Sequence, residues 1–125
     1  MAADTAPRID LVRVYDAVHD PPRGQVFLVD RVWPRGVRKE ALRLDGWPKD
    51  AAPSNELRTW FGHDPAKWEE FRERYTAELE SRPEAVAPLV EAARKGPVTL
   101  LFGAKDTEHN QAVVLRDHLR ARAGR

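Results

Sequence analysis

The sequence of 125 residues contains no cysteine, which excludes disulfide bonds, thiolate metal sites and cysteine nucleophiles. Serine is scarce as well: Ser54 and Ser81 are its two occurrences, and both stand where a helix is expected to begin or end. The sequence has no Walker phosphate-binding loop and no GxGxxG fingerprint. Covalent catalysis and these two modes of nucleotide binding are therefore not expected.

The net charge is close to zero, and the histidines are not clustered in the sequence. With 21 basic and 20 acidic residues the net charge is +1, which is no overall signature of nucleic-acid binding, although a local basic patch remains open. The histidines show no short paired spacing, so we expect no metal site, and no cofactor is indicated. They are His19, His63, His109 and His118.

Long hydrophobic runs are also absent. No run approaches the ~20 apolar residues of a transmembrane helix, so no membrane association is expected. Residues 1–7 lack the apolar core of a signal peptide and are expected to be a disordered lead of a cytoplasmic protein. A content of 42% hydrophobic and 33% charged residues is typical of a globular chain, and residues 8–125 are expected to form one domain. No particular oligomeric state is indicated.

Three apolar runs predict β-strands at residues 8–16, 25–29 and 98–102. Residues 17–24 are rich in turn residues and too short for a helical crossover. Their length favours either an antiparallel pairing of the first two strands or two strands that are not adjacent. Residues 42–47 alternate apolar and polar side chains and are expected to form a short edge strand.

Helical signals dominate the second half of the chain. Ser54 is a good N-cap for a first helix, and Asp64-Pro65 is typical of the start of a second. A third helix is expected after Pro83, and Pro88 should kink it or mark its true start. A fourth is expected over about residues 108–122. The residues of the second helix that are expected to lie in the core are Trp68, Phe71, Tyr75 and Leu79.

The second predicted strand leads into a stretch that brings charges and an indole ring to one place. Asp30, Arg31, Trp33 and Arg35 follow this strand directly. Open α/β sheets bind ligands beyond the carboxyl ends of their strands, and a guanidinium can bind phosphate or carboxylate through two hydrogen bonds. We therefore expect an anion-binding site here, with an ion-paired turn that closes the sheet as the alternative.

A second candidate stretch follows the last predicted strand. Lys105 would add a positive charge, and His109 and Asn110 are expected in the first turn of the final helix, where free backbone N–H groups favour an anion. If the second and last strands run parallel, both loops open on the same edge of the sheet and their cations converge. The alternative is that Asp106 or Thr107 only caps this helix.

The charges in these loops favour anion binding over proton-transfer catalysis. Asp30 and His109 could act as general base and general acid, because histidine titrates near neutral pH. Nearby arginines would instead lower the pKa of Asp30 and favour a role in orienting those arginines.

Several longer motifs resemble those of a known family. They are RVYD at residues 13–16, VDRVWPRGV at 29–37, DGWPKDAAPSNELRTWFGHDPAKWEEFRERY at 45–75 and VTLLFGAKDTEHNQAVVL at 98–115. Together these motifs resemble the YeaO-like branch of domain of unknown function 488. The resemblance implies a single α/β domain with a mainly parallel central sheet flanked by helices, and a pocket. The pocket residues it implies are Asp30, Arg31, Trp33, Arg35, His63, Lys105, His109 and Asn110.

Two functional hypotheses follow. The first is a cleft for an anionic small molecule with a phosphate or carboxylate group; whether it belongs to an enzyme, with Asp30 and His109 as the catalytic residues, is left open. The second is a nucleic-acid-binding or regulatory module that uses the helix pair at residues 54–80 or the arginine-rich last helix. The acidic residues on the second helix would repel the phosphates of a nucleic acid, so this helix is a poor surface for binding in a groove of DNA or RNA.

Overall fold

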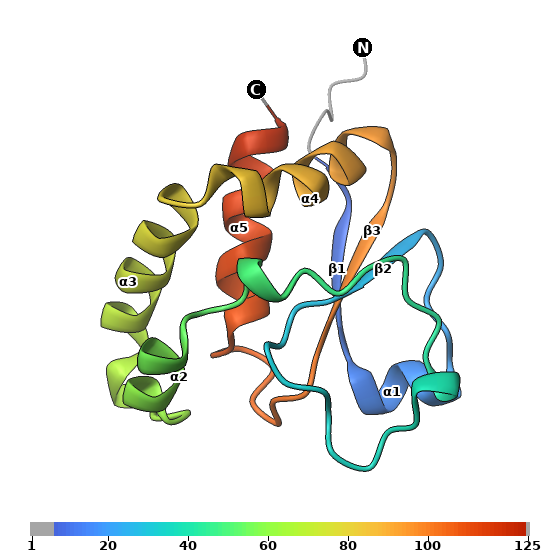
Figure 1. Cartoon of the computed structure of the whole chain (residues 1–125), viewed down its shortest axis with the longest axis horizontal. Helices are drawn as coiled ribbons and strands as arrows, with labels where there is room; N and C mark the ends of the chain where they lie inside the picture. The colour runs from blue at the N-terminus through green and yellow to red at the C-terminus, as the bar shows by residue number, and fades with distance from the viewer. Residues whose placement is uncertain (1–6, 125) are drawn as a thin grey trace.

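The computed structural model describes residues 7–124, so the lead expected over residues 1–7 lies almost wholly outside the described part. At its centre is a three-stranded parallel sheet with the order β1-β3-β2 (Figure 1). The strands are β1 (Ile9–Arg13), β2 (Gln25–Leu28) and β3 (Val98–Phe102). Helices pack on the sheet, which confirms the expected α/β fold with a parallel central sheet.

The central strand β3 separates β1 from β2. Val98 pairs with Ile9 of β1 and with Gln25 of β2, and all three strands run in the same direction. The antiparallel pairing considered for the first two strands is therefore wrong, and the alternative of non-adjacent strands is confirmed. The strand β3 comes last in the sequence, after a long connection, and lies between β1 and β2 in the sheet. The length of residues 17–24 alone cannot reveal that a later strand separates the first two.

A short helix, α1 (Val14–His19), replaces the end of the first predicted strand and part of the loop expected after it. Val14 and Ala17 are buried and Val18 is partly buried in the same cluster. Their spacing of three and four residues places them on one helical face, which packs against the sheet. Burial of this face outweighs the preference of the β-branched valines for a strand.

Residues 42–47 follow the outer edge of β2 but do not form the expected edge strand. A single parallel bridge joins Phe27 to Gly46, and the N–H of Asp45 donates to the carbonyl of Val26 over 2.7 Å. Gly46 lies against the ring of Phe27, where a Cβ atom would come within 3.1 Å of ring carbons. The segment therefore covers the edge of β2 without extending the sheet.

Four longer helices follow in the predicted order. They are α2 (Asn55–Phe61), α3 (Trp68–Glu80), α4 (Pro83–Lys95) and α5 (Gln111–Ala123), with single turns of 3-10 helix at Lys39–Ala41, Lys49–Ala51 and Pro65–Lys67. Ser54 caps α2 as expected, because its hydroxyl accepts a hydrogen bond from the N–H of Leu57 over 3.2 Å. Pro88 lies on the exposed side of α4, and it does not mark the start of this helix.

The last helix, α5, begins later than expected, at Gln111 rather than at about residue 108. Asn110 is its N-cap: the backbone of Asn110 is extended, and its side-chain oxygen accepts hydrogen bonds from the N–H groups of Ala112 and Val113 over 2.9 and 3.2 Å. His109 and Asn110 thus precede the helix instead of lying in its first turn. The strong cap ends the loop and sets the boundary.

Hydrophobic side chains fill both faces of the sheet. The larger core lies between the sheet and the helices α2 to α5, and the smaller one lies between the sheet, α1 and the loop after β2. Alternate residues of β3 serve the two cores: Leu100 belongs to the larger and Leu101 to the smaller. The expected burial of Phe71 and Tyr75 is confirmed, whereas Trp68 is only partly buried.

Candidate functional site

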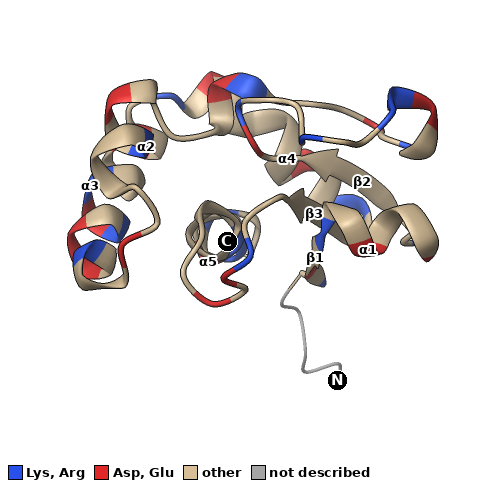
Figure 2. Cartoon of the chain, turned by 90° about the horizontal axis from the view of Figure 1, so that it is seen from below, with Lys and Arg blue, Asp and Glu red and all other residues tan. Residues whose placement is uncertain are grey.

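The loops that follow β2 and β3 open on the same edge of the sheet, because the two strands are parallel. The predicted site required the two loops to share an edge of the sheet, and the parallel strands confirm that they do. A cavity of about 400 Å³ lies beyond these strand ends and is lined by residues of α1, the loop after β2, α2 and the start of α5. Figures 1 and 2 show α1 and α2 on opposite sides of the strand ends.

Asp30 lies in the wall of the cavity, directly after β2. Its Oδ2 accepts a hydrogen bond from the N–H of Gly103 over 2.9 Å, and its Oδ1 accepts one from the side-chain amide of Gln111. A Cβ atom at residue 103 would lie 2.9 Å from Oδ2, so a larger residue there would require the carboxylate to shift. Both carboxylate oxygens are therefore held by the loop after β3 and by α5.

Burial raises the pKa of the Asp30 carboxyl from 3.8 to about 6. The hydrogen bonds from Gly103 and Gln111 lower the pKa, as do the nearby positive charges of His63 and Arg58, but burial outweighs them. The carboxyl thus titrates within reach of physiological pH, in contrast to the depressed pKa that the neighbouring arginines predicted.

Arg31 is held rigidly at the cavity by backbone carbonyl groups. Its Nε donates to the carbonyl of Pro53 over 2.9 Å and its Nη2 to the carbonyl of Ala52 over 3.3 Å. The guanidinium is partly buried, and within residues 7–124 no carboxylate forms an ion pair with it. Its Nη1 group is left to donate to a ligand, in an orientation already fixed by the two carbonyls.

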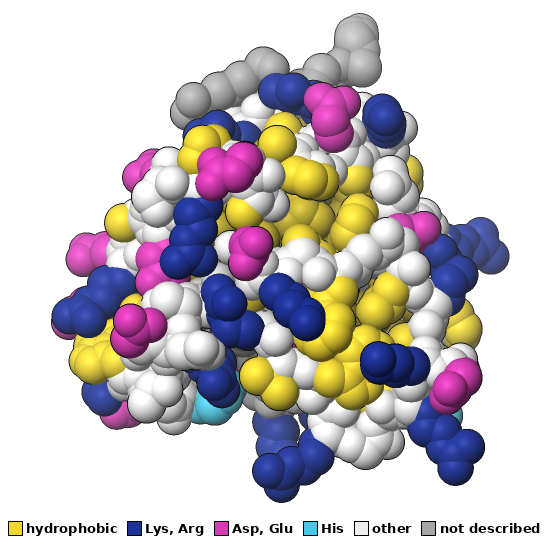
Figure 3. Space-filling view, in the orientation of Figure 1, with side chains coloured by type: hydrophobic (Ala, Val, Ile, Leu, Met, Phe, Trp, Pro, Cys, Tyr) yellow, Lys and Arg dark blue, Asp and Glu magenta, His cyan; other side chains and the backbone are white. Residues whose placement is uncertain are grey.

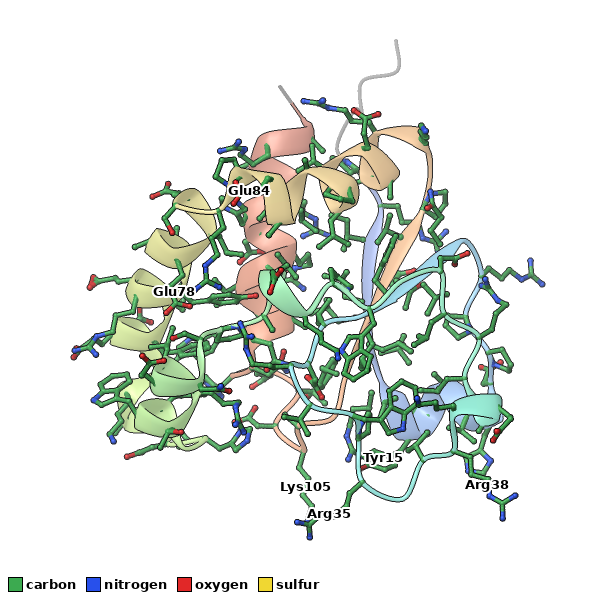
Figure 4. The ribbon with its side chains drawn as sticks, viewed as in Figure 1. Tyr15, Arg35, Arg38, Glu78, Glu84 and Lys105 are labelled. Atoms are coloured by element: carbon green, nitrogen blue, oxygen red, sulfur yellow. The ribbon has the colours of Figure 1, made fainter. Side chains whose placement is uncertain are left out.

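Two more arginines line the cavity, Arg35 from the loop after β2 and Arg58 from α2. Both are exposed, and neither forms an ion pair with another residue in the described part of the chain. Figure 4 shows Arg35 extending from its loop at the lower edge of the molecule, and Figure 3 shows lysine and arginine side chains along this edge. The cavity therefore carries an excess of positive charge.

His63 lines the cavity from the turn after α2 and has an unusual backbone conformation. Its φ of 58° is left-handed, and it is the only non-glycine residue among residues 7–124 with a positive φ. This conformation costs on the order of 1 kcal/mol for most side chains, although histidine tolerates it better than bulkier residues. Backbone strain of this kind is concentrated at functional sites, which supports a role for His63 in the cavity.

Part of the cavity wall is apolar and aromatic. It contains Tyr15 of α1 and Trp33 of the loop after β2, and the polar ends of both rings are already bonded within the protein. The hydroxyl of Tyr15 donates to the carbonyl of Arg35 over 3.0 Å, and Nε1 of Trp33 donates to the carbonyl of Val37 over 2.6 Å. These bonds tie α1 to the loop and fix the position of the wall.

The structure separates three predicted residues from the cavity. Lys105, His109 and Asn110 are not among its lining residues, although Lys105 extends from the same lower edge of the molecule (Figure 4). Nδ1 of His109 lies 2.9 Å from Oδ2 of Asp106, and its ring packs edge-on against Trp68 at 5.2 Å between centroids. Of the predicted set, the cavity brings together Asp30, Arg31, Trp33, Arg35 and His63.

Sequence reasoning missed several lining residues, above all Tyr15, Arg58 and Gln111. Tyr15 was assigned to a strand, and Arg58 carried no signal beyond its place one turn after the cap Ser54. Gln111 could have been found as the first residue of a helix that follows the central strand, had the start of that helix been placed correctly.

The expectation that Asn110 binds a ligand can be tested against its observed role as a cap. Asn110→Ala should lower the free energy of unfolding by about 1–2 kcal/mol, because the helix loses its N-cap. The mutation should leave the affinity for an anion in the cavity unchanged. Urea denaturation and a sulfate titration measure the two effects. A large loss of sulfate affinity would assign Asn110 to the ligand site after all.

The surface proposed for nucleic acid carries charges of both signs. On α3, Arg72 lies 3.4 Å from Glu69, and Arg74 forms an ion pair with Glu70. Figure 2 shows the colours of both charges on this helix. On α5, Arg116 lies 3.1 Å from Asp117. The nucleic-acid alternative stays a prediction, and these paired charges give it no support.

The described part of the chain contains neither a metal-binding cluster nor a membrane-spanning helix. Within residues 7–124 no three His, Asp or Glu side chains are placed to hold a metal ion together. No helix in the same range has the length and apolar character needed to cross a membrane.

The fold and the cavity define a small α/β domain with a parallel sheet and a cationic pocket at the carboxyl ends of its strands. Residues 8–125 match the family model described as the inactive DUF488-N3 subclade, and the chain belongs to this family.

Comparison with curated proteins supports this assignment. The chain is 44% identical over 113 residues to the uncharacterized protein YeaO of Escherichia coli, covering 90% of this chain and 97% of that protein. It is 40% identical over 115 residues to the uncharacterized protein Rv3073c of Mycobacterium tuberculosis, covering 92% and 96%. The expected membership of the YeaO-like branch is thereby confirmed. No solved structure matches the chain significantly.

Proposed function

We propose that this chain binds a small molecule with a phosphate or carboxylate group in the cavity beyond β2 and β3, and that it does so without catalysing a reaction. The observation that carries this proposal is the charge of the lining. Arg31, Arg35 and Arg58 line one cavity of about 400 Å³ without an ion-pair partner in residues 7–124. A cavity of this size falls in the range of ~300–1,000 Å³ typical of small-molecule sites.

The single carboxylate that faces these arginines does not neutralise them. Asp30 already accepts hydrogen bonds from Gly103 and Gln111, and its raised pKa makes the negative charge easy to lose as the pH falls. Like charges at close range repel, so a bound anion lowers the electrostatic energy of the site. A phosphate or carboxylate accepts paired hydrogen bonds from a guanidinium, and the fixed orientation of Arg31 favours such binding.

Binding without catalysis is favoured by the state of the reactive groups. Both oxygens of Asp30 are engaged, and the proposed acid partner His109 lies outside the cavity beside Asp106. The hydroxyl of Ser54 donates to Glu78 over 2.6 Å and is not free to act as a nucleophile. The description of the matching family model as an inactive subclade agrees with this view.

The proposal is tested by removing the two exposed arginines together. Arg35→Ala/Arg58→Ala should keep the fold, because Arg35 makes no side-chain hydrogen bond within residues 7–124 and Arg58 makes one long one, 3.5 Å from Asn55. Sulfate and phosphate should raise the melting temperature of the wild-type protein, because a ligand stabilises the state that it binds. The double mutant should lose about tenfold or more in affinity by calorimetry.

Arg38→Ala is the matched control for this experiment. Arg38 is also exposed but does not line the cavity, and Figure 4 shows it pointing away from Arg35. Its removal should leave the anion affinity unchanged apart from a small, salt-dependent effect. Equal losses in both mutants, or no binding of either anion by the wild type, would refute the proposal.

A further inference from the structure

We infer that the natural ligand of this cavity is a planar aromatic ring that carries a phosphate group, as in a nucleoside monophosphate. This inference rests on the proposed anion-binding function and goes further by naming the class of ligand. It depends on the apolar and aromatic surface that lines the cavity together with the arginines.

Charged and apolar side chains both line the cavity: Arg35 and Trp33 share the loop after β2, and α2 carries Arg58. Arg58 belongs to α2 and His63 to the turn after it, whereas Tyr15 belongs to α1 and is joined to the loop that carries Trp33. Helices α1 and α2 lie on opposite sides of the strand ends in both views (Figures 1 and 2). A ligand that fills the cavity must contact both the charged and the apolar side chains.

The apolar side offers surface but no free hydrogen-bonding group. The polar ends of Tyr15 and Trp33 are bonded to backbone carbonyls, and Val32 beside them is 57% exposed. Val32 is the one large hydrophobic side chain in residues 7–124 with such exposure, and it lines the cavity. An inorganic anion would leave this wall in contact with water, whereas a ring would cover it and release that water.

Two buried aromatic residues also line the cavity. Phe61 and Phe71 stack with 4.2 Å between their centroids, and both line the cavity. Aromatic rings prefer stacked or edge-to-face partners, which favours a planar ring over an aliphatic group. The volume of about 400 Å³ is far larger than a phosphate ion needs, so it leaves room for a ring and a sugar next to the anionic group.

The experiment compares four phosphate probes by calorimetry: inorganic phosphate, ribose 5-phosphate, phenyl phosphate and adenosine 5′-monophosphate. Adenosine, which lacks the phosphate, is titrated for comparison with its monophosphate. We expect the two probes with an aromatic ring to bind at least about tenfold more tightly than the two without one. Trp33→Leu should remove most of this advantage, measured within the variant as the ratio of its affinities for phenyl phosphate and inorganic phosphate. Val32→Ser, at an exposed position that costs little stability, should reduce the advantage in the same direction.

Trp60→Leu is the matched control, because Trp60 is partly buried on α2 but does not line the cavity. It should change none of the four affinities. If all four probes bind equally well, the inference about the ring is overturned and the proposed anion binding stands. If no probe binds, or if adenosine binds as tightly as its monophosphate, the proposed anion binding itself fails.

Discussion

Replacing Phe71 with alanine is expected to lower the free energy of unfolding by about 3–5 kcal/mol, the range for a fully buried phenylalanine. Its side chain is 2% exposed and stacks on Phe61 at 4.2 Å between ring centroids. Trp68 and Tyr75 lie on either side along α3, at 5.8 and 5.7 Å. The mutation removes the middle ring of this cluster, and the surrounding rings cannot close the gap without losing their own contacts.

Urea denaturation followed by circular dichroism measures this loss. Phe71→Leu should cost much less than Phe71→Ala, because it keeps most of the volume. Val32→Ala, at a position that is 57% exposed, should change the stability by less than about 0.5 kcal/mol. A loss below about 1 kcal/mol for Phe71→Ala would mean that the aromatic stripe is not the main contact between α3 and the core.

The same stripe shows how much of the fold follows from local sequence patterns. Helix α3 is preceded by an Asp64-Pro65 start signal and carries apolar residues at helical spacing, and both signals agree with the structure. The strand β3 was located without error because Val98–Phe102 is apolar throughout and follows the stop signal Gly96-Pro97. Strong signals of this kind come from residues close together in sequence, and tertiary contacts do not override them.

The errors lie where burial depends on residues far away in the sequence. Val14 and Ala17 form a helix because their face packs into the smaller core with Leu28 and Leu101. Nothing near residue 14 signals that core. The insertion of β3 between the first two strands is likewise a consequence of long-range pairing, which the length of one loop cannot specify.

The candidate site shows the same division. Asp30, Arg31, Trp33 and Arg35 were predicted from their position after a buried strand, and the cavity contains all four. Arg58 was not predicted, because it reaches the cavity only through the packing of α2 beside the strand ends.

The loop after β3 was misjudged for a local reason, its late helix start. Asp106 accepts hydrogen bonds from the N–H groups of Glu108 and His109, and this turn delays the helix until the cap at Asn110. Because residues 108–110 lie in the loop and not in the first helical turn, His109 packs against Trp68 rather than facing the cavity.

Asp30→Asn is expected to stabilise the protein at high pH, which is the second large effect. Burial raises the pKa of Asp30 from 3.8 to about 6, so the folded protein binds this proton more tightly than the unfolded chain does. The contribution of the group to stability is therefore present at low pH and lost as the pH rises through about 6. The difference between the pKa of Asp30 in the folded protein and in the unfolded chain corresponds to about 3 kcal/mol of stability. Most of this stability is lost between about pH 4 and pH 8.

The mutation replaces the carboxyl with a neutral group of the same shape. The amide can still accept a hydrogen bond from the N–H of Gly103, and Gln111 can turn its own amide to present an oxygen. The difference in unfolding free energy between Asp30→Asn and wild type should therefore grow by about 2–3 kcal/mol from about pH 4 to pH 8. Asp10→Asn, an exposed carboxylate that pairs with Arg8, is the control and should show a much smaller change.

The same substitution should strengthen anion binding at high pH, because it removes the negative charge that faces the arginines. Sulfate is the proper probe, since its own charge does not change over this range. Wild-type affinity should rise as the pH falls through about 6, and Asp30→Asn should bind about tenfold more tightly than wild type at about pH 8. Both proteins carry His63→Gln in this comparison, so that the imidazole is absent from the cavity and the two proteins differ only at residue 30. If Asp30→Asn instead weakens sulfate binding at every pH, Asp30 positions the guanidiniums, and its charge is part of the site rather than an obstacle to the ligand.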